Sequence, residues 1–399
     1  MLLNFSVENY KSIKKQVTLD FRKLFRDDFE SSLIKGKGLP LSVIYGPNGG
    51  GKSTILDAIF TLVMVVNDRL ENTSHYIRNN VINTGIKIIP FLLDDCSRNN
   101  PTKFEIIFEI NEIQYKYNLE CKDNKIIYES LYEKISRKAG KVFIRRLDHV
   151  ELGEKYKSIK VPQIGEAACA LNYIAKISTN DTVRKVFFYL SNNIGCIDFN
   201  NEIILQIMWD NLRRMEKDPE KKAYLNKLLK NMDLSIDSYT IEENNEGFKI
   251  YTNHKIDQKT YILHLQEESM GTQKIFSVLP VIMLTLINGT PIIIDEFDAK
   301  LHPKLLRYII ELFKNKEINK KGAQLIFTSH DISTLNSEVF RRDEIWFAAK
   351  NEEQATQLYS LADIRDENGN IVRKDASYSK QYLEGRYGAD PYLKIMRAW

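Results

Sequence analysis

The chain has 399 residues and a formal net charge of +4, with 57 Lys and Arg against 53 Asp and Glu. Because the charges nearly balance and 43% of the residues are hydrophobic, collagen-like and disordered classes are excluded and no strongly charged partner is required. The apolar stretches 59–66 and 276–287 are shorter than the ~18 to 20 residues of a membrane span. Residues 1–8 lack the features of a secretory signal. We therefore expect a cytoplasmic protein without a membrane partner.

Alternating apolar and polar residues predict strands in the N-terminal part of the chain, and one uninterrupted apolar run predicts a buried strand. A mostly apolar segment at 54–66 predicts a helix that is buried on most sides. From residue 104 onward, three alternating segments separated by polar turns predict an antiparallel meander. The predicted strands are 2–7, 16–21, 41–45, 104–110, 113–119 and 125–131.

The C-terminal part begins with helical spacing in residues 165–232, where the clearest helices are 200–215 and 221–232. Short strands are predicted within 236–265. From 277 to 346 the pattern alternates three times between helix and buried strand, which is typical of a parallel α/β core. The sequence therefore predicts an α/β fold that also contains an antiparallel β subdomain and a helical insertion.

A glycine-rich segment lies between the buried strand 41–45 and the following helix. Its sequence over residues 46–53, GPNGGGKS, matches G-x-x-x-x-G-K-[ST] in the strand-to-helix context that this motif requires. Glycines let consecutive N–H groups point at phosphate oxygens, and the helix N-terminus favours negative charge. Lys52 is expected to bridge the β- and γ-phosphates, and Ser53 to ligate Mg²⁺. The predicted ATP-binding residues are Asn48, Gly49, Gly50, Gly51, Lys52, Ser53 and Thr54.

A second motif is the apolar segment 291–294, which is followed by Asp295 and Glu296. This arrangement is that of a Walker B strand, whose carboxylates face the metal ion. Asp295 is expected to hold Mg²⁺ directly or through water, and Glu296 to orient or deprotonate the attacking water. Alone, such a strand end can be merely solvated, but together with the P-loop it predicts a Mg–ATP site.

Two further features lie on either side of this motif. Residues 268–273, ESMGTQ, precede an apolar helix predicted to begin near Gln273, so the amides of Ser269 and Gly271 are expected to form a second anion-binding site. His330 follows the next buried strand, at the carboxyl edge where ligands of open α/β sheets bind. A histidine in that position can also be purely structural.

In the order of these motifs, the chain resembles the ABC-type ATPase superfamily, in the branch that includes SMC-like and OLD-family proteins. The resemblance implies an ABC-type P-loop ATPase head that forms a homodimer or higher homo-oligomer with composite ATP sites. It also implies that Ser269 and Gly271 of one copy act in trans on the γ-phosphate held by another. By the same resemblance, His330 contacts the γ-phosphate in cis and Asp298 is the centre of a D-loop.

Residues 5–12 are similar to the N-terminal strand of SMC-like heads, whose basic residue lies near the nucleotide. Lys11 is the candidate for that residue, and an ordinary exposed lysine is the alternative. The expected organisation is an N-terminal half of the ATPase lobe (1–95), a β-meander subdomain (96–160), a helical insertion (161–235), the C-terminal half of the lobe (236–345) and a tail subdomain (346–399).

More narrowly, the Ser-x-Gly-Thr-Gln signature, residues 301–303 (LHP) and the tail 382–389 resemble the RloA/AbiL-like ATP-binding proteins of bacterial abortive-infection systems. This resemblance implies a sensor or regulatory subunit of an antiphage complex, with a phage protein or DNA as its trigger. Its partner would be a separately encoded effector, commonly a TOPRIM-type nuclease. Only about 55 residues follow Asp343, and independent domains are usually larger, so we expect the nuclease on another chain.

The sequence departs from the ABC pattern in two places. No Q-loop glutamine is found, because Gln114 falls within a predicted meander strand, and Met270 replaces the small or polar residue usual in the signature. We therefore expect slow ATP hydrolysis. Two alternatives stay open: a nucleotide-gated scaffold with little turnover, and an SMC-like DNA repair ATPase, for which basic pairs such as Lys320-Lys321 could contact DNA.

Overall fold

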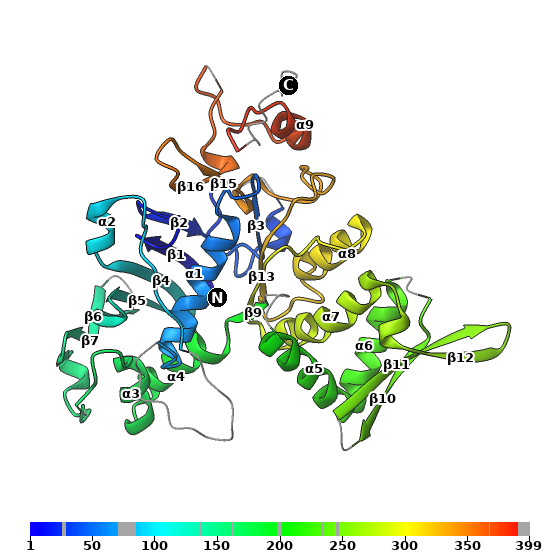
Figure 1. Ribbon diagram of the computed structural model, residues 1–399, viewed down its shortest axis with the longest axis horizontal. Helices are drawn as coiled ribbons and strands as arrows, with labels where there is room; N and C mark the ends of the chain where they lie inside the picture. Colours follow the sequence, from blue (N-terminus) through cyan, green and yellow to red (C-terminus); the bar gives the residue numbers. More distant parts are fainter. Residues whose placement is uncertain are drawn as a thin grey trace, which may run out of the picture.

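The computed structural model describes residues 1–25, 29–70, 85–135, 138–161, 163–197, 202–232, 235–244, 247–366 and 368–389. Two large β-sheets, with helices between and around them, form most of the molecule (Figure 1). The predicted α/β class is therefore confirmed.

A six-stranded sheet lies at the centre of the molecule. Its strands are β3 (Leu41–Tyr45), β9 (Gly195–Ile197), β13 (Pro291–Ile294), β14 (Gln324–Thr328), β15 (Ile345–Lys350) and β16 (Thr356–Ser360). They are ordered β16-β15-β3-β14-β13-β9, and all neighbouring pairs are parallel except β15 and β16. Every residue of β3, β13 and β14 is buried, as expected for the inner strands of a parallel sheet whose two faces are covered.

A seven-stranded antiparallel sheet lies beside it. Its strands are β1 (Leu2–Glu8), β2 (Val17–Asp20), β4 (Thr102–Ile110), β5 (Ile113–Lys122), β6 (Lys125–Ile135), β7 (Lys138–Arg146) and β8 (His149–Leu152). Their order is β2-β1-β4-β5-β6-β7-β8. The predicted meander is present, and the two N-terminal strands continue it, because β1 pairs with both β2 and β4.

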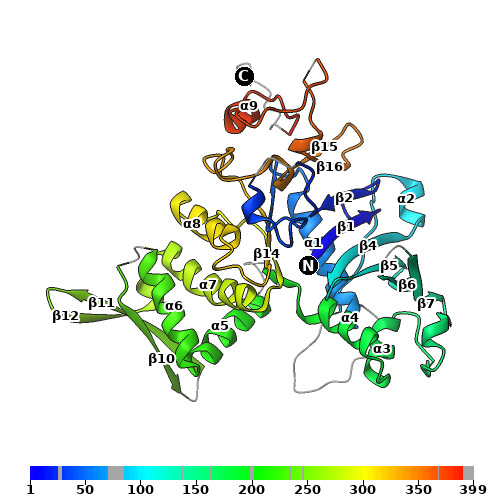
Figure 2. The same cartoon turned by 180° about the vertical axis from the view of Figure 1, so that it is seen from behind.

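Helix α1 lies between the two sheets, and α7 and α8 lie on the opposite side of the central sheet (Figures 1 and 2). Helix α1 shares one hydrophobic core with residues of both sheets, including Phe104 and Ile326. The helices are α1 (Lys52–Val66), α2 (Asp95–Asn99), α3 (Ala170–Ile177), α4 (Asp181–Asn192), α5 (Glu202–Glu216), α6 (Pro219–Asn231), α7 (Met270–Asn288), α8 (Pro303–Lys314) and α9 (Tyr378–Leu383).

The predicted helical insertion is divided into two pairs of helices. Helices α3 and α4 pack on the side of the antiparallel sheet, where Tyr189 stacks on Phe108 with ring centroids 4.8 Å apart. Helices α5 and α6 instead contact α7. Between the two pairs the chain returns to the central sheet as β9, which is parallel to β13. The division into five segments as a whole stays a prediction.

Three antiparallel strands between α6 and α7 form what we call the β-arm, residues 238–244 and 247–264. They are β10 (Ser238–Asn244), β11 (Gly247–Ile256) and β12 (Lys259–His264). The β-arm extends away from the rest of the molecule (Figures 1 and 2). Residues 259–263 of its edge strand are all exposed.

Two of the predicted helices differ in the structure. The helix expected between β14 and β15 is wrong: that segment forms turns and the 3-10 helix η4 (Arg342–Glu344). The side chains of Asp331 and Asn336 accept hydrogen bonds from nearby backbone N–H groups, and such local bonds compete with helix formation. Helix α7 begins at Met270 rather than near Gln273.

Helix α7 is the one candidate membrane span among the described residues. It has 19 residues and is long and apolar enough to cross a membrane. The apolar segment is thus longer than the stretch 276–287 identified from the sequence. However, 67% of its apolar window is buried inside the protein. This burial is what a core helix of a folded domain requires.

Candidate functional site

The P-loop is pressed against the hairpin formed by β15 and β16. A Cβ atom on Gly46 would lie 2.1 Å from the Ala348 carbonyl oxygen, and one on Gly51 would lie 2.0 Å from Thr356 Oγ1. Gly51 also has a φ of +101°, which side chains rarely allow. The loop therefore needs glycine at these two positions for a close approach as well as for its turn.

Lys52 lies in the first turn of α1 with its amine turned back into the loop. Its Nζ donates hydrogen bonds to the carbonyl oxygens of Gly46, at 2.9 Å, and Pro47, at 3.1 Å. Burial lowers the pKa of Lys52, while the nearby acids at 295, 296 and 298 act in the opposite direction. Within the described part of the chain, no carboxylate forms an ion pair with Lys52. A buried cation in this state suits a phosphate group.

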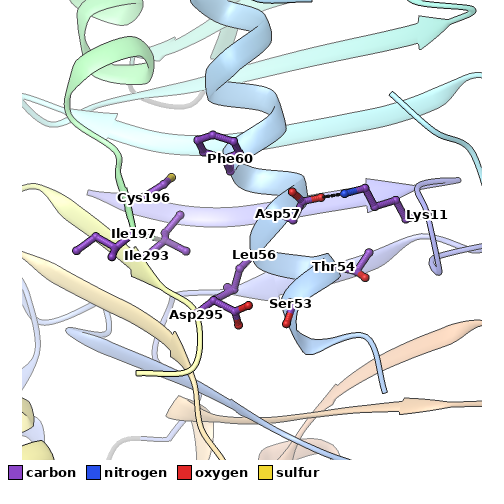
Figure 3. Close-up of a pocket in the computed structure, with 10 residues that line it drawn as sticks. All are labelled: Lys11, Ser53, Thr54, Leu56, Asp57, Phe60, Cys196, Ile197, Ile293 and Asp295. Carbon is purple, nitrogen blue, oxygen red and sulfur yellow. Dashed lines mark hydrogen bonds and ion pairs between the residues drawn. The ribbon is translucent and has the colours of Figure 1, made fainter. Parts of the chain in front are cut away.

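Ser53 and Asp295 line one cavity of about 370 Å³ (Figure 3). Their side chains face the same space from α1 and from the end of β13. The Thr328 hydroxyl donates to Asp295 Oδ1 at 2.5 Å and fixes this carboxylate. A hydroxyl and one carboxylate fit Mg²⁺, which usually takes its other ligands from phosphates and water. Among the described residues, no cluster of three His, Cys, Asp or Glu side chains could hold a metal without such help.

The turn after β13 carries the predicted catalytic group. Glu296 is exposed, has a φ of +46°, and donates its backbone N–H to Thr328 Oγ1 at 2.7 Å. The His330 N–H donates to Asp298 Oδ2 at 3.0 Å, so the D-loop and the end of β14 are joined. Among the residues that the structure describes, Asp298 Oδ1 is buried without a hydrogen-bond partner. Burial and the charge of Lys52 lower the pKa of His330, which favours a neutral imidazole.

The signature residues lie apart from this cavity. Ser269 is the N-cap of α7: its Oγ accepts a hydrogen bond from the Thr272 N–H at 3.1 Å. Ser269 is exposed and Met270 is 59% exposed, and neither these residues nor Gly271 are among those that line the cavity in the described structure. The structure therefore brings Ser53, Thr54 and Asp295 together at one cavity, whereas Ser269 and Met270 face solvent. Within the described structure, Lys52, Glu296 and His330 are also not among the residues that line this cavity.

Lys11 does line the cavity, on the side away from Asp295 (Figure 3). Its Nζ lies 2.5 Å from Asp57 Oδ2, and the Tyr10 hydroxyl donates to the same oxygen. Asp57 is one turn after Ser53 on α1. Lys11 therefore lies at the cavity where the nucleotide is expected. A contact between Lys11 and the nucleotide stays a prediction.

Comparison with known proteins identifies the family. Residues 41–336 match the family model described as "AAA domain, putative AbiEii toxin, Type IV TA system". The chain belongs to this AAA family. A solved structure described as the SmcHead bound to the C-winged helix domain of ScpA is similar at 14% sequence identity and a TM-score of 0.47, over 90% of this chain and 97% of that chain. No curated protein matches the sequence.

As an AAA domain, the chain is an ATP-binding protein of the P-loop ATPase class. Three residues of its site were not found from the sequence. Thr328 was seen only as part of a strand end, although it bonds both Asp295 and the Glu296 amide. Cys196, in β9, lines the cavity opposite α1 (Figure 3). Asp57 could have been found from its spacing, since residues 53 and 57 share one face of a helix. No glutamine is among the described lining residues, so a Q-loop residue stays unassigned.

Proposed function

We propose that this chain is an ABC-type head that binds and slowly hydrolyses Mg–ATP. The observation that carries the proposal is the convergence of Ser53 and Asp295 on one cavity, with the buried amine of Lys52 close enough to Asp295 for the two charges to interact. Lys52 would bind the β- and γ-phosphates, and Ser53 and Asp295 would hold the metal ion, which neutralises phosphate charge during transfer. Glu296 would orient or deprotonate the attacking water, and the neutral His330 would donate to the γ-phosphate.

The active form would be a homodimer, or a higher homo-oligomer, with ATP between two copies. Ser269 supports this part, because it is exposed at the start of a 19-residue helix, and the N-terminus of a helix favours an anion. In the dimer, Ser269 and Gly271 of one copy would contact the γ-phosphate bound to the P-loop of the other. Hydrolysis would remove this contact and loosen the dimer.

In the cell, the head would act in the cytoplasm as the sensor or regulatory subunit of an antiphage defence complex. It would control a separately encoded effector, for which a TOPRIM-type nuclease is the first candidate, in response to a phage protein or DNA. The family description, which refers to a putative AbiEii toxin and a type IV TA system, supports a role in defence. The narrower resemblance to RloA/AbiL-like proteins supports the same role.

The test of the ATPase is the Glu296→Gln variant. It should bind ATP with the parental affinity and hydrolyse it at least about 100-fold more slowly, because a positioned general base typically contributes that much. With ATP it should accumulate as a dimer in light-scattering measurements. The matched control is Glu317→Gln, which changes an exposed glutamate outside the cavity. Hydrolysis by Glu296→Gln at the parental rate would show that the catalytic assignment is wrong.

The defence role needs a separate measurement in cells. The chain and its neighbouring reading frames should reduce plaque formation by a phage, and the reduction should disappear when Glu296 is replaced by Gln in this chain alone. If the parental set gives no protection, the defence role is excluded and the ATPase assignment is unaffected. If the variant protects as well as the parental chain, defence does not depend on ATP hydrolysis by this chain.

A second candidate is an SMC-like DNA repair ATPase. One observation favours it: a cavity of about 360 Å³ is lined by four lysines and by no acidic residue in the described structure, namely Lys35, Lys316, Lys320 and Lys321. DNA phosphates would be attracted there in a salt-dependent manner. DNA-stimulated hydrolysis that weakens with salt would favour this candidate over the antiphage sensor. A nucleotide-gated scaffold would instead bind ATP tightly and release negligible phosphate.

A further inference from the structure

The catalytic turn is bonded to the signature helix through one buried lysine. Lys274 lies on α7, is 9% exposed, and donates from Nζ to the carbonyl oxygen of Glu296 at 3.0 Å. It also donates to the carbonyl oxygen of Ala299 at 2.7 Å. The two acceptors are three residues apart, so one amine holds both ends of the turn that contains the D-loop aspartate.

Two hydrogen bonds hold the backbone of Glu296, one from Lys274 and one to Thr328. The Glu296 N–H donates to Thr328 Oγ1, and its carbonyl oxygen accepts from Lys274. Between the two bonds the residue has a φ of +46°, a left-handed conformation that is uncommon for residues other than glycine. The direction in which the Glu296 side chain leaves the backbone therefore depends on both bonds.

The same helix begins at the signature. Ser269 caps α7, and Lys274 follows five residues later. Gly271 lies so close to the catalytic turn that a Cβ atom there would be 2.9 Å from the Lys300 carbonyl oxygen. The first turns of α7 and residues 296–300 are therefore packed together, and a shift of the helix start would move the lysine and its two acceptors.

We propose that Lys274 is a positioning residue that holds Glu296 in its working orientation and makes that orientation depend on the signature end of α7. When a second copy engages Ser269, the helix start is fixed, and Lys274 transmits this to the turn that carries Glu296. Hydrolysis thus follows assembly, whereas ATP binding at the P-loop does not depend on Lys274. This inference rests on the proposed ATPase function.

The charge of Lys274 agrees with this role. Burial lowers its pKa to about 8, while the carboxylates of Asp298 and Glu296 act in the opposite direction and Lys300 lowers it further. The amine therefore remains mostly protonated at pH 7. A cation makes stronger hydrogen bonds to carbonyl oxygens than a neutral donor.

The test compares Lys274→Met with Lys274→Arg in the full chain. In the Met variant, kcat should fall about tenfold because charged hydrogen bonds are lost, while KM and the Kd for ATP stay within about twofold. The Arg variant, which keeps a cation, should recover most of kcat. Lys227→Met, at an exposed position of α6, is the matched control. Thermal melting of every variant shows whether it is folded.

A double variant separates positioning from a general structural role. If Lys274 acts through the Glu296 side chain, adding Lys274→Met to Glu296→Gln should not lower the residual rate further. A parental kcat in Lys274→Met, or an additional tenfold loss in the double variant, would overturn the inference. If the parental protein itself does not hydrolyse ATP, the proposed function fails instead, so the two failures are distinguishable.

Discussion

At the P-loop end of the molecule, Lys52 and Thr328 are buried and bonded to other groups of the same chain. At the signature end, Ser269 and Met270 face solvent at the start of α7. The first region is completed by strands β3, β13 and β14 of one sheet, which bring their carboxyl ends together. The second is joined to a projecting sheet, the β-arm, and lies outside the cavity of the first.

The difference indicates which half of the chemistry one copy can perform. A preformed cavity beside a buried cation would bind ATP within one copy, because Ser53, Asp295 and Lys52 all belong to the same chain. An exposed serine at a helix N-terminus gains a phosphate partner only if another surface brings one. Binding should therefore belong to the P-loop end alone, and turnover should require both ends.

Replacing Lys52 with Met tests the P-loop end and should have the largest effect. ATP affinity should fall about 100-fold, because a buried, charge-assisted contact to phosphate is lost. Titration with a fluorescent ATP analogue measures the change, with Lys227→Met as the exposed control. Parental affinity in Lys52→Met would mean that this cavity is not the nucleotide site.

Replacing Ser269 with Ala tests the signature end. ATP affinity should change less than about twofold, whereas turnover should fall about tenfold because the trans contact is missing. The change also removes an N-cap, which by itself costs about 1 kcal/mol of stability. Asn180→Ala removes a comparable cap at the start of α4, where the Val183 N–H donates to Asn180 Oδ1 outside the cavity, and should keep parental turnover.

A mixture of Lys52→Met and Ser269→Ala proteins tests whether the signature of one copy acts on the P-loop site of another. A dimer of one Lys52→Met copy and one Ser269→Ala copy contains one site with both an intact P-loop and an intact signature. The mixture should therefore hydrolyse ATP faster than either variant alone. If the mixture is no faster than the average of its components, Ser269 does not act in trans.

The strands and the P-loop could be predicted because their signals are local. Apolar runs, alternation and the glycine pattern each lie within a few residues of the feature that they specify. β9 was missed because three residues, 195–197, show no periodicity, and its pairing with β13 joins segments almost one hundred residues apart. The prediction of a helix between β14 and β15 was wrong because the side chains of Asp331 and Asn336 accept hydrogen bonds from nearby backbone N–H groups, which favours turns.

The candidate site shows the same difference between features specified locally and features that depend on long-range contacts. Asp295 and Glu296 follow from a strand that ends in acids, but the bond from Thr328 to Asp295 depends on the register of two parallel strands. The contact of Lys274 with the catalytic turn likewise depends on how α7 packs on β13. Residues within a local motif can thus be predicted from the sequence, whereas the residues that orient them can be identified only from the tertiary structure.

The smallest expected effect concerns the connection between the β-arm and the signature. Glu268 precedes Ser269, and its Oε1 lies 2.6 Å from both Thr252 Oγ1 and His254 Nε2 on β11. Glu268→Gln keeps the size of the side chain but removes its charge, which weakens these bonds. Turnover should fall about threefold, the factor expected for a weakened hydrogen bond, with unchanged ATP affinity and with Glu317→Gln as the control. Parental turnover would mean that the β-arm does not help to place Ser269, and that the signature end is positioned by the packing of α7 alone.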